Sequence, residues 1–387
     1  MKVALVHDYL NQYGGAERVL DELHQIWPNA PVYASIYNPA RMPERYRSWD
    51  IRTSSLNRLP FANQKHQALL FMLPQAFEEF DLDEYDLVVS SSSGFAHGVL
   101  TSPSTLHVCY CHSPPRFLWD YHHYAKSEGL HGPARWIVER SLPRLRVWDR
   151  VAADRADVWI STSRLVQARI DRFYDKRSIV IPPPVDVGRF SVAPGRGDFL
   201  LMAMRLVGWK RPEIAVEACT QLGLPLVVAG DGRDLTELKR IAGPTVRFVG
   251  WADDDRLREL YRDCQAFILP SAEDFGIAPI EAMAAGKPVI AYGSGGVLDT
   301  VLPGETGLLF RSQTAESLAA VLSTFDPCDF DPVRIRRHAE TFDKGIFAAR
   351  LKSLVEIHLR KHRMRQELAQ APLLGPTQVA NAEAQFV

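Results

Sequence analysis

Short apolar runs recur along the chain and are separated by segments with helical periodicity. Parallel strands that are buried on both faces appear in a sequence as such runs, rich in Val, Ile and Leu. In the first half the runs predict strands at residues 3–6, 86–89, 106–110, 158–163 and 179–181. In the second half they predict strands at residues 199–204, 226–229, 246–249, 266–269, 289–291 and 308–310.

Helices are predicted between these strands. The first has an apolar face formed by Val19, Leu20, Leu23, Ile26 and Trp27. In the second half, helices are expected at residues 212–222, 234–241, 254–262, 279–285 and 314–322, and a last one at 346–365. Strands that alternate with helices are typical of an α/β protein with doubly wound parallel sheets.

A run of three prolines marks the clearest linker. Pro182–Pro184 follows the last strand predicted in the first half and precedes a glycine-rich turn. We therefore expect an N-terminal domain over residues 1–190 and a second domain over residues 191–345, with sheets that face each other across a cleft. The last helix, within residues 346–368, would pack back toward the first domain. The Ala/Gln/Pro-rich residues 369–387 are expected to be disordered.

One strand–loop–helix unit in the second domain combines glycine, proline and two carboxylates. After the apolar run at 266–269, Gly276 permits a tight turn and Pro279 suits the first turn of a helix. Ligands bind outside the carboxyl ends of strands in open α/β sheets, and a helix N-terminus attracts phosphate. A carboxylate repels phosphate, so we expect Glu273 and Glu281 to accept hydrogen bonds from sugar and ribose hydroxyls. The alternative is that both are ordinary solvated residues.

Three further segments that follow a predicted strand contain candidate ligand-binding residues. Gly14 and Gly15 would let a ligand approach the backbone, although adjacent glycines often form only a turn. His112 faces a ligand or is held by a backbone carbonyl. Arg205 and Lys210 follow the first strand of the second domain and can clamp a diphosphate, Arg through a planar fork and Lys as a point charge.

The composition limits the classes of function. The chain has 387 residues, 46% hydrophobic and 24% charged, which is ordinary for a globular protein of two or three domains. A formal net charge of −1 gives no reason to expect nucleic acid binding. Five scattered cysteines predict a reducing compartment, and Cys109 and Cys111 with His112 lack the second ligand pair of a metal site.

Apolar runs are too short to span a membrane, because none approaches the ~18 residues required. The amino terminus reaches His7 too soon for a signal peptide, which predicts a cytoplasmic protein. Residues 131–155 are nevertheless rich in arginine and tryptophan, and such a helix can lie on an anionic membrane surface beside the apolar segment Leu69–Leu73. Its arginines can equally pair with the acidic residues Glu139, Asp149 and Asp154, and the pattern leaves both interpretations open.

The order of these motifs resembles that of the retaining glycosyltransferases of family four, which have the GT-B fold of two Rossmann-like domains. The resemblance spans nearly the whole chain and is carried by Arg205 with Lys210, Gly230–Gly232, Glu273 with Glu281, Gly286–Val289 and Gly304–Leu309. The first half is similar to a narrower branch that is often found in bacterial surface-polysaccharide clusters. Its marks are His7–Tyr9, Gly14–Arg18, Tyr110–Arg116, Trp119 with Asp120, and Val147–Arg150.

The resemblance implies a role for the charged candidates. Arg205, Lys210 and the helix N-terminus after Gly276 would stabilise the diphosphate leaving group without a metal or another cofactor. Glu281 would bind the ribose hydroxyls and Glu273 the hydroxyls of the donor sugar. Retention would follow a front-face path in which the departing phosphate oxygen helps to deprotonate the acceptor hydroxyl. No second carboxylate is then needed as a nucleophile.

The resemblance also assigns the less polar positions. His112 would face the transferred sugar from the first domain. The backbone near three residues would line the base pocket: Val249, Gly250 and Trp251. The other implied donor-binding residues are Gly14, Gly15, Gly230, Phe275 and Ile277.

Members of the narrower branch are commonly mannosyltransferases that use GDP-mannose. The resemblance therefore implies transfer of a hexose, mannose in the first place, to a lipid-linked saccharide at the cytoplasmic face of the inner membrane. The implied partners are a nucleotide sugar, this acceptor and an anionic membrane surface. Two alternatives remain open. One is a nucleotide-sugar 2-epimerase that acts on UDP-N-acetylglucosamine without an acceptor, and the other is a non-catalytic protein that binds sugar nucleotides or polysaccharides.

Overall fold

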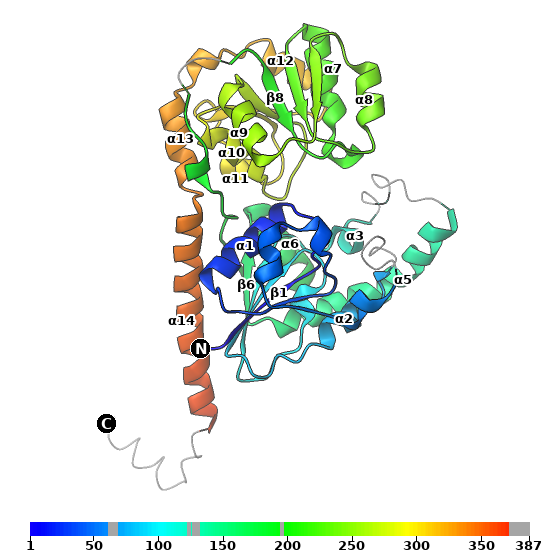
Figure 1. Ribbon diagram of the computed structural model, residues 1–387, viewed down its shortest axis with the longest axis vertical. Coiled ribbons are helices and arrows are strands. Elements are labelled where there is room, and N and C mark those ends of the chain that lie inside the picture. The colour runs from blue at the N-terminus through cyan, green and yellow to red at the C-terminus, as the bar shows by residue number, and fades with distance from the viewer. Residues whose placement is uncertain (61–68, 122–124, 126–131, 194–196, 371–387) are drawn as a thin grey trace.

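The computed structural model describes residues 1–60, 69–121, 125, 132–193 and 197–370. Two α/β domains are stacked one above the other, and the long C-terminal helix runs along one side of the lower, N-terminal domain (Figure 1). Strands alternate with helices in both domains, and every strand pairing within the two sheets is parallel. The predicted α/β class with two doubly wound parallel sheets is confirmed.

In the described residues of the N-terminal domain, a seven-stranded sheet has the order β3-β2-β1-β4-β5-β6-β7. Its strands are β1 Val3–His7, β2 Val32–Ala34, β3 Ile51–Thr53, β4 Leu87–Ser92, β5 Leu106–Cys111, β6 Val158–Ser161 and β7 Ser178–Val180. Its helices are α1 Gly15–Ile26, α2 Leu73–Glu78, α3 Arg116–Trp119, α5 Gly132–Ala152 and α6 Arg164–Tyr174. The edge strand β3 and its neighbour β2 are additions to the sequence prediction.

Hydrophobic clusters cover both faces of this sheet, because successive strand residues point to opposite sides. On one face Leu5 packs in a cluster with Leu20 of α1 and Leu351 of the C-terminal helix. On the other face Val6 belongs to a cluster with Phe77 of α2. The C-terminal helix thus completes the core of the N-terminal domain.

In the described C-terminal domain, a six-stranded sheet has the order β10-β9-β8-β11-β12-β13. Its strands are β8 Leu200–Ala203, β9 Leu226–Ala229, β10 Val246–Gly250, β11 Ala266–Leu269, β12 Val289–Tyr292 and β13 Gly307–Phe310. Its helices are α7 Pro212–Leu222, α8 Leu235–Ile241, α9 Asp254–Asp263, α10 Ile277–Ala284, α11 Val297–Thr300, α12 Ala315–Leu322 and α13 Pro332–Glu340. Strand order reverses beside β8 here and beside β1 in the other sheet, and such reversals open crevices for ligands.

Two chain segments cross between the domains and pair with each other. The Val185 N–H donates to the Phe342 carbonyl at 3.1 Å, and the Lys344 N–H donates to the Val185 carbonyl at 3.0 Å. The Lys344 ammonium also lies 2.7 Å from Asp186. Helix α14 (Lys344–Gln370) then leaves this hinge along the N-terminal domain. From residue 371 onward, the tail expected to be disordered lies outside the described residues.

Candidate active site

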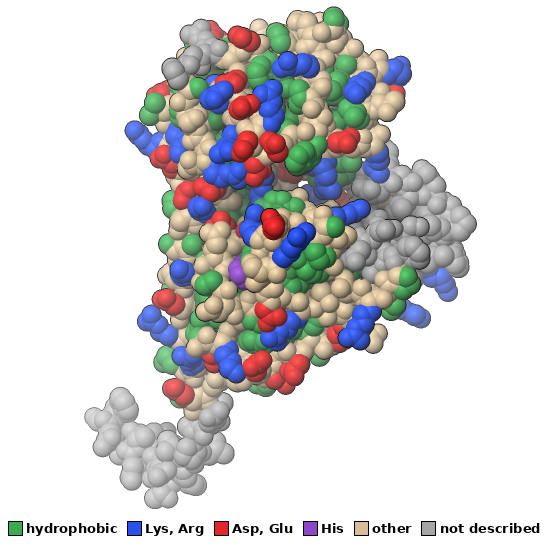
Figure 2. Space-filling view, viewed as in Figure 1, with side chains coloured by type: hydrophobic (Ala, Val, Ile, Leu, Met, Phe, Trp, Pro, Cys, Tyr) green, Lys and Arg blue, Asp and Glu red, His purple; other side chains and the backbone are tan. Residues whose placement is uncertain are grey.

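The carboxyl ends of the central strands in both sheets face the junction between the domains. The loop after β11 carries Glu273, and the loop after β8 carries Arg205 and Lys210. In the other domain, β5 ends at Cys111, directly before His112. The surface is hollowed at this junction, and Lys, Arg, Asp and Glu side chains border the hollow (Figure 2). The fold therefore gathers candidate residues from both domains along one cleft.

Glu273 and Lys210 form an ion pair on the C-terminal wall of this cleft. The Lys210 Nζ lies 3.0 Å from Glu273 Oε1, and the Ser271 hydroxyl donates a 2.9 Å hydrogen bond to the same oxygen. Burial raises the pKa of the Glu273 carboxyl, but the nearby Lys210 charge and these two hydrogen bonds outweigh it. Its pKa therefore lies below the ordinary value. Glu273 is ionised at neutral pH, and neither contact uses its second oxygen.

Close backbone contacts fix the loop that carries Glu273. The Gly296 N–H donates to the Glu273 carbonyl at 2.8 Å, and a Cβ at Gly295 would lie 2.3 Å from that carbonyl oxygen. Gly276 precedes α10 with a φ of 88°, a region that residues with a side chain rarely adopt. Helix α10 begins at Ile277, so its first N–H groups, which have no acceptor inside the helix, lie at the ligand-facing edge of the sheet.

Arg205 is the exposed cation of this wall. Its guanidinium makes no hydrogen bond or ion pair within the described part of the chain. Lys210, by contrast, is paired with Glu273 and lies 5.0 Å from the centre of the Trp209 ring. The loop after β8, the strand that pairs with β11, therefore offers one unpaired cation and one paired cation on the wall that carries α10, which suits a diphosphate.

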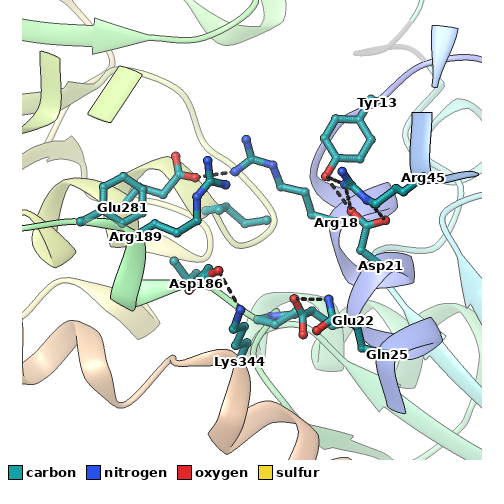
Figure 3. Close-up of a pocket in the computed structure, with 14 residues that line it drawn as sticks. Tyr13, Arg18, Asp21, Glu22, Gln25, Arg45, Asp186, Arg189, Glu281 and Lys344 are labelled. Carbon is teal, nitrogen blue, oxygen red and sulfur yellow. Dashed lines mark hydrogen bonds and ion pairs between the residues drawn. The ribbon is translucent and has the colours of Figure 1, made fainter. Parts of the chain in front are cut away.

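Glu281 lies on the same helix and is tied to the N-terminal domain. Its Oε1 pairs with the Arg18 guanidinium of α1, and its Oε2 accepts a 3.0 Å hydrogen bond from the Tyr261 hydroxyl. Arg18 also lies 3.3 Å from Asp254 at the start of α9. Figure 3 shows Arg18 reaching across the gap between the domains toward Glu281. A ribose at Glu281 would therefore share the carboxylate with Arg18 or displace the guanidinium.

A cavity of about 300 Å³ extends from Glu281 toward the hinge (Figure 3). Glu281 and Ile277 line it on one side, and α1 lines it on the other. Glu273, Lys210 and His112 are not among its lining residues. The cavity is therefore a polar extension of the cleft on the hinge side of Glu281, away from the Glu273–Lys210 ion pair.

The adjacent glycines of the N-terminal domain lie against α10. A Cβ at Gly15 would approach the Ile277 Cδ1 atom to 3.3 Å, so the two domains are in close contact here. The Gly14 N–H donates a 2.7 Å hydrogen bond to Glu17, which orders the start of α1. The backbone of the first domain is thereby placed beside the helix N-terminus of the second.

His112 belongs to a chain of hydrogen-bonded side chains in the N-terminal wall. Its Nε2 lies 2.8 Å from the Ser91 hydroxyl, which in turn lies 3.1 Å from His7 Nδ1. His7 Nε2 is 3.5 Å from Glu17 Oε1. Burial, together with the neighbouring His7, lowers the pKa of His112 to about 3. The imidazole is therefore neutral at physiological pH and can hydrogen-bond a sugar without carrying charge.

Two family models match consecutive parts of this chain. The model described as Glycosyltransferase Family 4 matches residues 13–189, and the one described as Glycosyl transferases group 1 matches residues 189–328. Together they run over both domains and include His112, Glu273 and Glu281. The chain belongs to glycosyltransferase family 4.

Curated relatives of this family 4 glycosyltransferase match it over parts of their length. A D-inositol 3-phosphate glycosyltransferase of Streptomyces scabiei is 28% identical over 266 residues, which are 59% of this chain and 58% of the relative. A glycogen synthase of Pseudomonas paraeruginosa is 34% identical over 145 residues, 35% of this chain and 28% of the relative. The chain spans somewhat more than half the length of the first of these relatives and less of the second.

Solved structures similar to the family 4 chain have the same two-domain fold. Anabaena HepE in complex with UDP has a TM-score of 0.69 at 19% identity and covers 92% of this chain and 100% of its own. Sucrose-phosphate synthase from Thermosynechococcus elongatus has a TM-score of 0.71 at 21% identity, covering 96% and 100%. The expected GT-B fold is confirmed.

Other candidate residues of this glycosyltransferase lie at the rim of the cleft. Gly230 follows β9 and donates its N–H to the Gly250 carbonyl at 2.7 Å, which joins the ends of β9 and β10. Trp251 is 77% exposed, and Val249 is half-buried. Among the described residues, no hydrogen bond or ion pair joins Gly230, Val249, Gly250 or Trp251 to the Glu273–Lys210 pair, so the base pocket stays a prediction. Phe275 is buried in the domain core.

The acidic run before α9 is occupied by protein contacts. The Asp253 carboxylate caps α9 by accepting the Arg256 N–H at 2.8 Å. Asp254 lies 2.9 Å from Arg189, in addition to its contact with Arg18. Among the described residues, no group of three or more His, Cys, Asp or Glu side chains is close enough together to hold a metal ion.

Sequence reasoning missed two charged residues of the cleft. Arg18 stands in a quoted motif, but its partner Glu281 is 263 residues away. Asp274 adjoins Glu273, and its partner Arg116 is 158 residues away. The sequence did offer one signal: Arg18 at the start of α1 and Arg116 after β5 both stand at the ligand-facing edge of the first domain.

Proposed function

We propose that this chain is a retaining hexosyltransferase that moves mannose from GDP-mannose to a lipid-linked saccharide during assembly of a bacterial surface polysaccharide. The observation that carries the proposal is the ionised Glu273 paired with Lys210 beside an unpaired Arg205. The start of α10 lies next to them, and the neutral His112 belongs to the other domain. This combination suits a nucleotide sugar, which brings both phosphate charge and hydroxyl groups.

The charges in the cleft suit the departure of a nucleoside diphosphate. Negative charge builds on the β-phosphate as the anomeric bond breaks, and Arg205, Lys210 and the first N–H groups of α10 would stabilise it. Glu273 would accept hydrogen bonds from hydroxyls of the donor sugar, and neutral His112 would face the same ring. The departing phosphate oxygen would take the proton of the attacking hydroxyl on the same face, which retains the anomeric configuration.

The first prediction concerns the donor and the role of metals. Nucleotide release is measured from GDP-, UDP- and ADP-sugars in buffer that contains EDTA, with a lipid-linked saccharide as acceptor. We expect GDP-mannose to be turned over, and EDTA to have no effect because Arg205 and Lys210 meet the phosphate charge. UDP-hexoses are the competing donors, since the similar HepE was crystallised with UDP-glucose.

The same assay separates the alternatives. Conversion of UDP-N-acetylglucosamine without an acceptor would indicate a 2-epimerase. Thermal stabilisation by nucleotide sugars without turnover of any of them would indicate a non-catalytic binding protein. Turnover that EDTA abolishes and Mn²⁺ or Mg²⁺ restores would contradict the metal-free mechanism. The Arg205→Gln/Lys210→Gln variant is the control for activity that arises outside this site.

We further propose that the N-terminal domain binds the surface of an anionic membrane. Val147 and Val151 of α5 are 66% and 57% exposed, and Arg140 and Arg144 are exposed on the same helix. Trp148 of α5 donates a 2.9 Å hydrogen bond to Glu78 of α2, so α2 and the exposed Phe71 and Met72 before it adjoin α5. Side chains of residues 131–137 lie outside the described residues. No described helix is long and apolar enough to cross a membrane.

The second prediction tests this surface by liposome flotation. Replacing Arg140 and Arg144 by glutamine should weaken partition to anionic vesicles by about 30-fold, since each basic residue contributes about 1 kcal/mol. The matched control replaces Arg247 and Arg311, exposed arginines of the C-terminal domain, and should float like the wild type. Equal flotation of the wild type with neutral and anionic vesicles would remove the electrostatic part of the proposal.

A further inference from the structure

One carboxylate of the C-terminal domain is held by two arginines of the N-terminal domain. Arg116 binds the Asp274 carboxylate through two guanidinium nitrogens: Nε donates to Oδ2 at 3.1 Å, and Nη2 lies 2.6 Å from Oδ1. The Arg169 Nη1 lies 2.5 Å from the same Oδ1. The three side chains are between 20% and 31% exposed. Such forked, charge-assisted contacts fix geometry more tightly than a single ion pair.

Further hydrogen bonds complete the binding site of Asp274 on the N-terminal domain, which we call its seat and which consists of Arg116, Arg169 and Ser163. The Ser163 hydroxyl of the N-terminal domain donates to the Asp274 backbone carbonyl at 2.6 Å. The Arg169 guanidinium also donates to the Ser113 hydroxyl at 3.1 Å, which links it to the loop after β5. Both the side chain and the main chain of Asp274 are therefore held by the opposite domain.

Two of the residues that form these contacts are direct neighbours in sequence of Glu273 and His112, the catalytic candidates of the two domains. Asp274 directly follows Glu273, and Ser113 directly follows His112. Arg116 in addition lies 5.5 Å from the centre of the Trp209 ring, which Lys210 also contacts. The seat of Asp274 thus connects the loop of Glu273 to the loop of His112, one residue away from each.

We propose that Asp274 is a positioning residue: its docking between Arg116 and Arg169 sets the placement of Glu273 relative to His112 when the domains close. The inference rests on the proposed transferase function, in which these two residues face the same sugar. A carboxylate held by two nitrogens of Arg116 and one of Arg169 cannot shift without breaking several contacts, so the adjoining Glu273 backbone is fixed with it. Donor affinity should depend on this seat far less than turnover, because Arg205, Lys210 and Glu281 belong to the C-terminal domain alone.

The third prediction is therefore a split between turnover and binding. Asp274→Asn should lower kcat by about 10- to 100-fold, the range expected when reacting groups are misplaced by about 1 Å. The Kd for GDP should change by less than about two-fold. The Arg116→Gln/Arg169→Gln variant should show the same loss, and adding Asp274→Asn to it should cost little more, because all three residues act through one seat.

A matched control is available in the same interface. Asp299 of α11 also holds an N-terminal arginine, since it accepts the Arg164 N–H at 2.6 Å and lies 2.5 Å from its Nε. It is distant in sequence from both catalytic candidates. Asp299→Asn should therefore keep kcat within about three-fold of the wild type. An equal loss in Asp299→Asn and Asp274→Asn, or an unchanged kcat in Asp274→Asn, would overturn the proposal.

A measurement of the distance between the domains tests the role of Asp274 independently of turnover. Spin labels are attached to the exposed Cys328 and to a cysteine introduced as Ser104→Cys, one in each domain. With GDP bound, the distribution of distances should be narrow in the otherwise wild-type protein and broader or longer after Asp274→Asn. Identical distributions would overturn the proposed seat. Failure of the wild type to turn over any nucleotide sugar would instead refute the proposed function, so the two failures are distinguishable.

Discussion

Replacing Glu273 by glutamine is expected to lower kcat by about 10²- to 10³-fold and to change the affinity for free GDP by less than about two-fold. Groups that stabilise charge at the reacting centre typically have effects of this size. Glutamine keeps the size of the side chain but removes the charge that pairs with Lys210 at 3.0 Å. Because GDP carries no sugar, its binding should not report a contact made to the donor sugar in the transition state.

The measurement is steady-state turnover of GDP-mannose, with Glu305→Gln as the matched control. Glu305 is an exposed residue of the same domain, 3.6 Å from Arg334 and far in sequence from the β11–α10 loop. The control variant should retain full activity. Normal turnover by Glu273→Gln would show that this loop does not contact the donor sugar.

Replacing Glu281 by glutamine should instead weaken the binding of GDP itself, whichever sugar the donor carries. A charge-assisted hydrogen bond is typically worth about 1.5–3 kcal/mol, which corresponds to about 10- to 150-fold in Kd. Glu281 is 8% exposed, forms an ion pair with Arg18 and accepts a hydrogen bond from Tyr261. Within the described part of the chain, its loss leaves Asp254 as the remaining acidic partner of the Arg18 guanidinium.

Two companion variants separate the ribose contact from these protein contacts. Arg18→Gln removes the interdomain ion pair but keeps the Glu281 carboxylate, and Tyr261→Phe removes one hydrogen bond without changing charge. Both should bind GDP within about three-fold of the wild type by titration calorimetry. If Arg18→Gln weakens GDP binding as much as Glu281→Gln does, Glu281 acts through the ion pair rather than through the ribose.

Local patterns were sufficient to predict the architecture of both domains. Buried parallel strands such as Leu226–Ala229 and Ala266–Leu269 are continuous apolar runs, and they alternate with helices. The edge strand Ile51–Thr53 and its neighbour Val32–Ala34 escaped prediction because each has three residues, and the edge strand includes an arginine. Helix α10 starts at Ile277, ahead of the expected Pro279, because the turn ends at Gly276, whose φ of 88° lies outside the helical region.

The candidate site was predictable only where its chemistry is local. Glu273, Gly276 and Glu281 share one strand–loop–helix unit, so their spacing alone places them at the ligand-facing edge. The contacts of Arg18 with Glu281 and of Arg116 with Asp274 join different domains, and no periodicity in the sequence encodes how two domains meet. The depressed pKa of His112 likewise depends on burial by elements that are distant in sequence.

The central claim is that this cleft binds a nucleotide sugar with Glu273 at the sugar and Glu281 at the nucleoside. One paired measurement tests it most directly: calorimetric titration with GDP and turnover of GDP-mannose, both made on Glu273→Gln and on Glu281→Gln. The account predicts opposite patterns, with lost turnover and intact GDP binding in the first variant and weakened GDP binding in the second. The same pattern in both variants, or loss of GDP binding only in Glu273→Gln, would contradict it.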